Sequence, residues 1–113
     1  MRSLSLPLLT GLILLSGYSV ITHAEALTDL TLTIKDHKFI PSLLTAPAGK
    51  KIKLWVNNQD ATAEEFESYS LNREKVIPGN SQGKIFIGPL QPGTYDFFGD
   101  FHKATAAGKI VAK

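Results

Sequence analysis

The stretch TDLTLTIK at residues 28–35 decides the fold class. Its apolar side chains, Leu30, Leu32 and Ile34, alternate with polar ones, and this period of two is typical of a half-buried β-strand. The same alternation returns at residues 52–56. Both segments lack the spacing of three to four residues that an amphipathic helix needs. The chain therefore starts its folded part as a β protein.

Short strand candidates continue to the end of the chain, with turn-forming residues between them. Besides the first segment they are residues 39–43, 52–56, 64–71, 84–87, 94–98 and 108–112. Residues 72–75 are predicted to form a helical turn. The expected core aromatic residues are Trp55, Phe66, Phe86, Tyr95, Phe97 and one of Phe98 or Phe101. About seven short strands at this spacing predict an all-β sandwich or barrel.

The first residues have the pattern of a secretory signal peptide. A positive start at Arg2 precedes an almost wholly apolar run over residues 4–21, and small residues follow at Ala24 and Ala26. We expect a signal peptide at residues 1–24, cleavage after Ala24 or Ala26, and one domain at residues 28–113. The alternative is an uncleaved membrane anchor. We expect a periplasmic protein with no stable membrane insertion after cleavage.

Composition excludes several classes of function. The chain has no cysteine, so neither disulfides nor a lipidated leader cysteine are available. Without Arg2 the mature chain holds 11 basic and 10 acidic residues, which is not the charge of a nucleic-acid-binding protein. The sequence also lacks the Gly-x-Ser-x-Gly motif of many hydrolases and a glycine-rich phosphate loop. A hydrolase or a nucleotide enzyme is therefore unsupported.

Possible metal ligands remain as the main chemical feature. They are His37, His102, Asp100, Glu64, Glu65 and Glu67. Strand alternation places the side chains of Glu65 and Glu67 on one face of their strand and that of Glu64 on the other. The pattern alone does not bring these residues together.

Two groups of motifs resemble the cupredoxins over nearly the whole mature chain. The first half carries Phe39-Ile40-Pro41, then PAGKKI at 47–52 and WVNN at 55–58. The second half carries PGTYDFF at 92–98, followed by His102 and GKIV at 108–111. The resemblance implies a cupredoxin-like Greek-key β-sandwich. It is strongest to the EfeO-type periplasmic proteins of bacterial iron and copper handling, for which EEFES at 64–68 and FGDFH at 98–102 look diagnostic.

The resemblance also implies where a metal site would lie. Carried over residue by residue, Glu64 stands where the family has its first histidine, Gly99 where it has cysteine, and His102 on the second histidine. The methionine position falls near residues 105–107, and the mature chain has no methionine. Because type 1 blue copper needs a cysteine thiolate, such a centre is excluded here.

A site with nitrogen and oxygen ligands is the hypothesis that remains. The resemblance places His37 at the metal-site end, where it would be a ligand together with His102 and Glu64. Glu65 or Asp100 would be the alternative ligand. Such ligands favour one Cu(II), zinc or iron ion over Cu(I). The expected role is metal binding that assists iron uptake or copper handling, with components of an iron transport system as partners. A copper-dependent ferroxidase and a metal-free docking domain are the alternatives.

Overall fold

The computed structural model describes residues 2–5, 7, 10–19 and 26–113. Nine strands and one 3₁₀ turn occupy the described residues after Ala26: β1 (Thr28–Lys35), β2 (Lys38–Ile40), β3 (Leu43–Ala46), β4 (Ile52–Asn58), β5 (Glu64–Ser68), β6 (Arg73–Ile77), β7 (Ser81–Ile87), β8 (Gly93–Gly99), η1 (Asp100–His102) and β9 (Ala107–Ala112). The expected all-β fold is confirmed, with two more strands than the sequence indicated.

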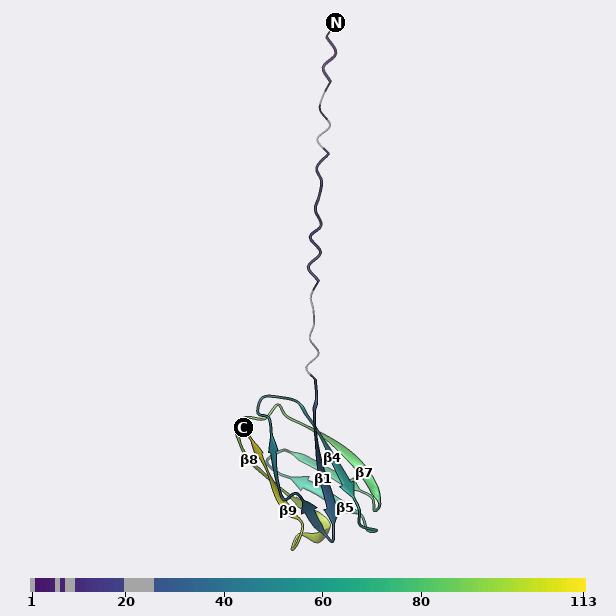
Figure 1. Ribbon diagram of the computed structural model, residues 1–113, viewed down its shortest axis with the longest axis vertical. Helices are drawn as coiled ribbons and strands as arrows, with labels where there is room; N and C mark the ends of the chain where they lie inside the picture. The colour runs from purple at the N-terminus through teal and green to yellow at the C-terminus, as the bar shows by residue number, and fades with distance from the viewer. Residues whose placement is uncertain (1, 6, 8–9, 20–25) are drawn as a thin grey trace.

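The strands form two sheets that face each other (Figure 1). One sheet has the order β2-β1-β4-β7, and the other has the order β3-β9-β8-β5-β6. Most neighbours are antiparallel, whereas β1 with β4 and β3 with β9 are parallel. The chain crosses from one sheet to the other at residues 41–42, between β2 and β3, and this crossing divides the segment that the sequence presented as one strand.

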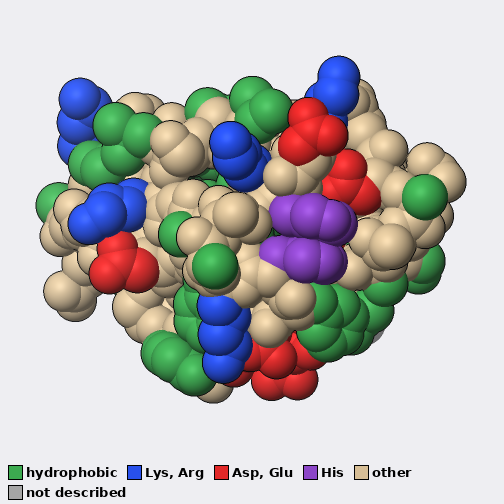
Figure 2. Space-filling model, turned by 90° about the horizontal axis from the view of Figure 1, so that it is seen from below, with side chains coloured by type: hydrophobic (Ala, Val, Ile, Leu, Met, Phe, Trp, Pro, Cys, Tyr) green, Lys and Arg blue, Asp and Glu red, His purple; other side chains and the backbone are tan. Residues whose placement is uncertain are grey.

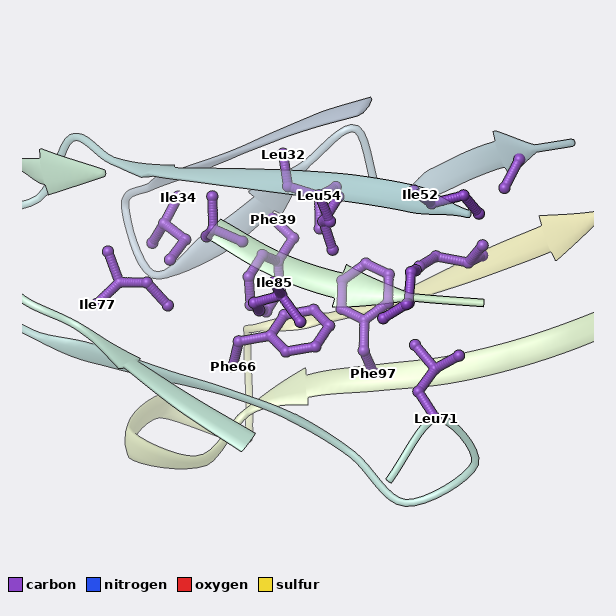
Figure 3. Packing of buried hydrophobic residues seen from close by; sticks show 14 of the residues in the cluster. Leu32, Ile34, Phe39, Ile52, Leu54, Phe66, Leu71, Ile77, Ile85 and Phe97 are labelled. Atoms are coloured by element: carbon purple, nitrogen blue, oxygen red, sulfur yellow. The ribbon is translucent and has the colours of Figure 1, made fainter. Parts of the chain in front are cut away.

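The core lies between the sheets, as the alternation predicts. Leu32, Ile34 and the inward-facing residues Ile52, Leu54 and Val56 of β4 are fully buried. Phe66 and Phe97 stack with ring centroids 5.2 Å apart, and Phe39 meets the Phe97 ring edge-on at 5.0 Å. Figure 3 shows Phe66 and Phe97 reaching from their strands into the space between the sheets. These three rings form the aromatic centre of the core.

Four sequence-based predictions need correction. Neither Phe98, which is half-buried, nor Phe101, which is exposed, belongs to the core. Phe86, expected in the core, is 49% exposed, and Trp55 is only half-buried. Both rings lie on the outer face of their sheet beneath the ammonium group of Lys53, which stands 5.4 Å from the Trp55 centroid. Residues 72–75 are not a helical turn, because β6 begins at Arg73 and pairs with β5.

The N-terminal segment lies away from the sandwich. Residues 10–19 have no helix or strand, and Leu12, Leu14 and Leu15 are more than 80% exposed. Among the residues that the structure describes, no helix is long and apolar enough to cross a membrane. The predicted cleavage after Ala24 lies outside the described residues, and the signal peptide remains a prediction.

The topology brings four segments to the end of the sandwich opposite the N-terminal segment (Figure 1). Because β1 and β4 run parallel with Ile34 beside Asn58, the β1–β2 turn lies next to the loop that follows β4. β8 ends at Gly99, which is paired with Phe66 of β5. The turn η1 then follows directly. Residues far apart in the sequence therefore meet here.

Candidate metal centre

His37 reaches this end through an unusual two-residue turn between β1 and β2. Asp36 and His37 both have positive φ angles, 53° and 57°. A tight hairpin of this type needs positive φ at both central residues, and the usual choice is asparagine, aspartate or glycine at the first and glycine at the second. Side chains with a Cβ atom are disfavoured in this conformation. Other contacts must therefore hold the turn.

Asp60, in the loop after β4, provides those contacts. Its Oδ1 accepts a hydrogen bond from the Asp36 backbone N–H at 2.8 Å, and its Oδ2 accepts one from the His37 N–H at 3.0 Å. The His37 imidazole Nδ1 lies 3.5 Å from the same Oδ2. The N–H of His37, aided by that of Asp36, lowers the pKa of Asp60 although burial opposes the shift.

Asn58 in turn fixes Asp60. The Asn58 Oδ1 accepts a hydrogen bond from the Asp60 N–H at 3.0 Å, and its Nδ2 donates to the carbonyl oxygens of Thr62 and Ile77. Asn58 is itself 1% exposed. The β4–β5 loop thus presents the Asp60 carboxylate in one place.

Glu64, at the start of β5, is a buried carboxylate with both oxygens engaged. It is 1% exposed. Its Oε1 accepts from the backbone N–H of Phe101 at 2.9 Å and of Glu65 at 3.0 Å. Its Oε2 lies 2.5 Å from Nδ1 of His102. A buried carboxylate requires such partners, and these fix its orientation.

The two imidazole rings stack on one another at the surface. His37 and His102 have ring centroids 3.6 Å apart and planes inclined by only 13°. Their side chains are 44% and 27% exposed. Figure 2 shows the two rings side by side on the end of the molecule, with carboxylates beside them. Thr105 also helps to hold the His37 backbone in place, because its hydroxyl donates a hydrogen bond to the His37 carbonyl oxygen at 2.6 Å.

The arrangement leaves one nitrogen of each ring for a ligand. Each Nδ1 is turned toward a carboxylate, Asp60 for His37 and Glu64 for His102. Histidines that bind metals commonly present one nitrogen to the ion while a carboxylate holds the other. Because the rings lie in nearly parallel planes, the lone pairs of their free nitrogens do not point toward one common position in this arrangement. One ring must turn for both to bind a single ion.

The five predicted ligands do not form one cluster. His37, His102 and Glu64 are brought together, whereas Glu65 and Asp100 belong to a separate group with Glu67. In the part of the chain that the structure describes, this acidic group is the only trio of potential ligand side chains with donor atoms within 4.8 Å of one another.

Two carboxylates of this acidic group interact with charged neighbours, Glu65 with Glu74 and Asp100 with Lys103. Burial and the neighbouring Glu74 carboxylate raise the pKa of Glu65. Asp100 pairs with Lys103 at 3.1 Å. Partly exposed carboxylates often gather without a bound ion, and we assign no ligand to this group.

A type 1 copper centre does not fit the residues present. A Cβ atom added at Gly99, where the resemblance led us to expect the family's cysteine position, would lie 2.6 Å from Cδ of Glu64 and 2.7 Å from Cβ of Ala106. The Glu64 carboxylate thus fills the space that a side chain at position 99 would need. The chain has no cysteine to supply the thiolate that type 1 copper requires, and a side chain at position 99 would have no room beside Glu64.

Comparison with known proteins settles the family. The family model described as the cupredoxin-like domain matches residues 8–112. The chain belongs to this family. An uncharacterized protein of Rickettsia prowazekii (strain Madrid E) is 46% identical over 87 residues, which cover 77% of this chain and 70% of that protein.

Solved cupredoxin structures have the same fold. Auracyanin A, a blue copper protein from Chloroflexus aurantiacus, is 14% identical with a TM-score of 0.66, covering 78% of this chain and all of that one. Amicyanin from Paracoccus versutus is 17% identical with a TM-score of 0.58, covering 82% and 86%. At such identities the likeness concerns the fold alone.

Proposed function

We propose that this cupredoxin-like domain binds one divalent transition-metal ion through the Nε2 atoms of His102 and His37. The observation that carries the proposal is the exposed imidazole pair in which each Nδ1 faces a carboxylate. Glu64 acts in this proposal as the residue that orients His102 and not as a ligand, because hydrogen bonds occupy both of its oxygens.

The donor set favours Cu(II) among the available metals. Imidazole nitrogen suits copper, zinc, nickel and iron, and affinity for divalent ions normally peaks at copper. Soft sulfur ligands, which select Cu(I), are missing because the mature chain has neither cysteine nor methionine. The bound ion should therefore lack the intense blue colour of a copper–thiolate centre.

The biological setting is proposed from the leader and from the EfeO-type resemblance. Export through the signal peptide would place the domain in the periplasm, where it would take up a metal ion and assist iron uptake or copper handling. Its partners would then be periplasmic or membrane components of a metal transport system. N-terminal sequencing of the protein from a periplasmic extract tests export, with Glu25 or Leu27 expected as the first residue.

The metal proposal is tested by titrating the metal-free mature domain with Cu(II), using calorimetry and electron paramagnetic resonance. One ion per chain with nitrogen coupling is expected. His102→Ala should abolish specific binding, and His37→Ala should weaken it about tenfold or more. Asp29→Ala, which removes an exposed carboxylate of β1, is the matched control and should bind normally.

Two results would overturn the metal proposal or redirect it. Absence of binding tighter than that of the buffer leaves the metal-free docking domain as the interpretation. Binding that persists in the His37→Ala, His102→Ala double variant moves the site to the carboxylates. Oxygen consumption with Fe(II) and bound copper, compared with free copper, decides whether ferroxidase activity accompanies binding.

A further inference from the structure

His37 stands over His102 because of contacts made by its backbone and not by its ring. The ring contact with Asp60 is long, at 3.5 Å, whereas the backbone N–H groups of Asp36 and His37 donate to that carboxylate at 2.8 and 3.0 Å. Two successive N–H groups in a turn form a concave site that suits an anion. The Asp60 carboxylate occupies that site.

The need for Asp60 follows from the sequence of the turn. Neither residue of the turn is glycine, and both adopt left-handed backbone angles that a side chain disfavours. Without the carboxylate, the N–H groups of Asp36 and His37 would lose their acceptor, and the turn would have other conformations available. The hydrogen bond from Thr105 to the His37 carbonyl oxygen would remain, but the His37 ring would be held next to His102 much less firmly.

We propose that Asp60 is a positioning residue that fixes the β1–β2 turn so that the His37 imidazole stands against His102. The expected effect of Asp60 on metal affinity rests on the proposed function. Its expected effect on the position of the His37 ring in the metal-free protein does not. Because the backbone is held tightly and the ring loosely, the His37 side chain can turn toward an ion without the turn moving.

The metal-free protein provides the first test. The mature domain contains two histidines, since the third, His23, lies in the leader, so the two imidazole signals in a proton–nitrogen NMR spectrum are easily assigned. Stacking at 3.6 Å shifts the ring protons of each histidine. Asp60→Ala should abolish most of that mutual shift, and His37→Ala should do the same for the His102 signals. Asp29→Ala should leave it unchanged.

The second test asks whether Asp60 acts through His37. Asp60→Ala should weaken Cu(II) binding 10- to 100-fold in the otherwise unchanged domain, as losses of outer-shell groups commonly do. In the His37→Ala background the same change should have no further effect. Asp60→Asn keeps one acceptor oxygen and the side-chain volume, so it should fold normally and show an intermediate loss.

The outcomes separate this proposal from the proposed function. If the domain binds no metal but Asp60→Ala still abolishes the ring shifts, positioning stands and the metal function fails. If the ring shifts persist in Asp60→Ala and Asp60→Asn, the positioning role is wrong, whatever the metal does. Equal losses of affinity in both backgrounds would likewise contradict it.

Discussion

At the scale of single residues, Gly99 and Glu64 form one steric unit. The hypothetical Cβ of residue 99 overlaps Cδ of Glu64 and Cβ of Ala106, both closer than 3.0 Å. Glu64 cannot move away easily, because its carboxylate is buried and bonded to two N–H groups and an imidazole. A glycine is therefore required at position 99.

Gly99→Ala should destabilise the domain by about 1–3 kcal/mol, the usual cost of an overpacked core. Urea unfolding at neutral pH measures it. In a Glu64→Ala background the contacts with the Glu64 carboxylate are removed and only the contact with Cβ of Ala106 remains, so the same change should cost less. Additive effects in this double-mutant cycle would contradict the steric coupling.

Asp60 gives the protein an acid-sensitive contact. Its pKa is lowered in the folded state, so its contribution to stability is complete above its unfolded pKa, about 4. That contribution is lost as the pH falls through the lower folded value. The stability difference between wild type and Asp60→Asn should thus be largest above about pH 5 and shrink toward pH 2. A difference that stays constant over this range would show that the carboxylate charge plays no part.

The residues of the site were predictable to different degrees. His37, His102 and Glu64 could be named from residue type and family resemblance, and the structure brings them together. The role of Asp60 could not be predicted from the sequence. It depends on a turn conformation and on the parallel pairing of β1 with β4, and a local sequence pattern reveals neither. The only signal was its place in the polar turn after Asn58.

At the scale of elements, the alternation of apolar and polar residues predicted burial well wherever the two faces of a strand differ in polarity. It correctly separated Glu64 from Glu65 and Glu67 on β5. It failed for Phe86, whose outward position is set by the register of β7 against β4 and is compensated by the Lys53 side chain. It also failed at β6, where pairing with β5 overrides a local composition that suits a helical turn.

The pairing of β5 with β6 places like charges together. Glu67 lies directly opposite Glu74, and the pKa of Glu65 is raised by burial and by the same Glu74 side chain. A raised carboxyl pKa means that stability is lost as the pH rises through that value. Glu74→Lys places a cation directly opposite Glu67. This opposite-charge pair should stabilise the domain at pH 7 by about 0.2–1 kcal/mol, a typical cross-strand effect.

Thermal unfolding of the Glu74→Lys variant and of wild type, at pH 7 and at pH 3, measures this effect. The advantage should disappear at pH 3, where the carboxyl groups are protonated. Lys84→Glu, a charge change on the outer face of the other sheet, is the control for general charge effects. An advantage that persists at low pH would mean that the gain comes from packing.

At the scale of the whole molecule, the core and the candidate site depend on different parts of the sandwich. The buried apolar residues come from both sheets and lie between them, whereas the imidazole pair lies on one end and is held by loops. Removing His37 should leave the fold intact, whereas removing His102 takes away the partner of the buried Glu64 Oε2 and should lower stability. The fold class could be predicted from the sequence because that core follows the period-two pattern. The loop-built end, in contrast, depends on tertiary contacts.

This separation leads to a prediction for metal binding and stability. An ion that binds only the folded state stabilises it by about 2.7 kcal/mol at a free concentration one hundred times its Kd. For a domain of under 100 residues, each kcal/mol raises Tm by roughly 4–8 °C. Saturating Cu(II) should therefore raise Tm by about 10–20 °C.

Zinc should raise Tm less than copper at equal free concentration, in line with its weaker binding. The His37→Ala, His102→Ala double variant should unfold below the Tm of the metal-free wild type, because Glu64 Oε2 loses its buried partner, and its Tm should not rise with either ion. A fall in Tm on adding copper would mean that the unfolded chain binds the ion more tightly. The imidazole pair would then not be a site that the fold has organised.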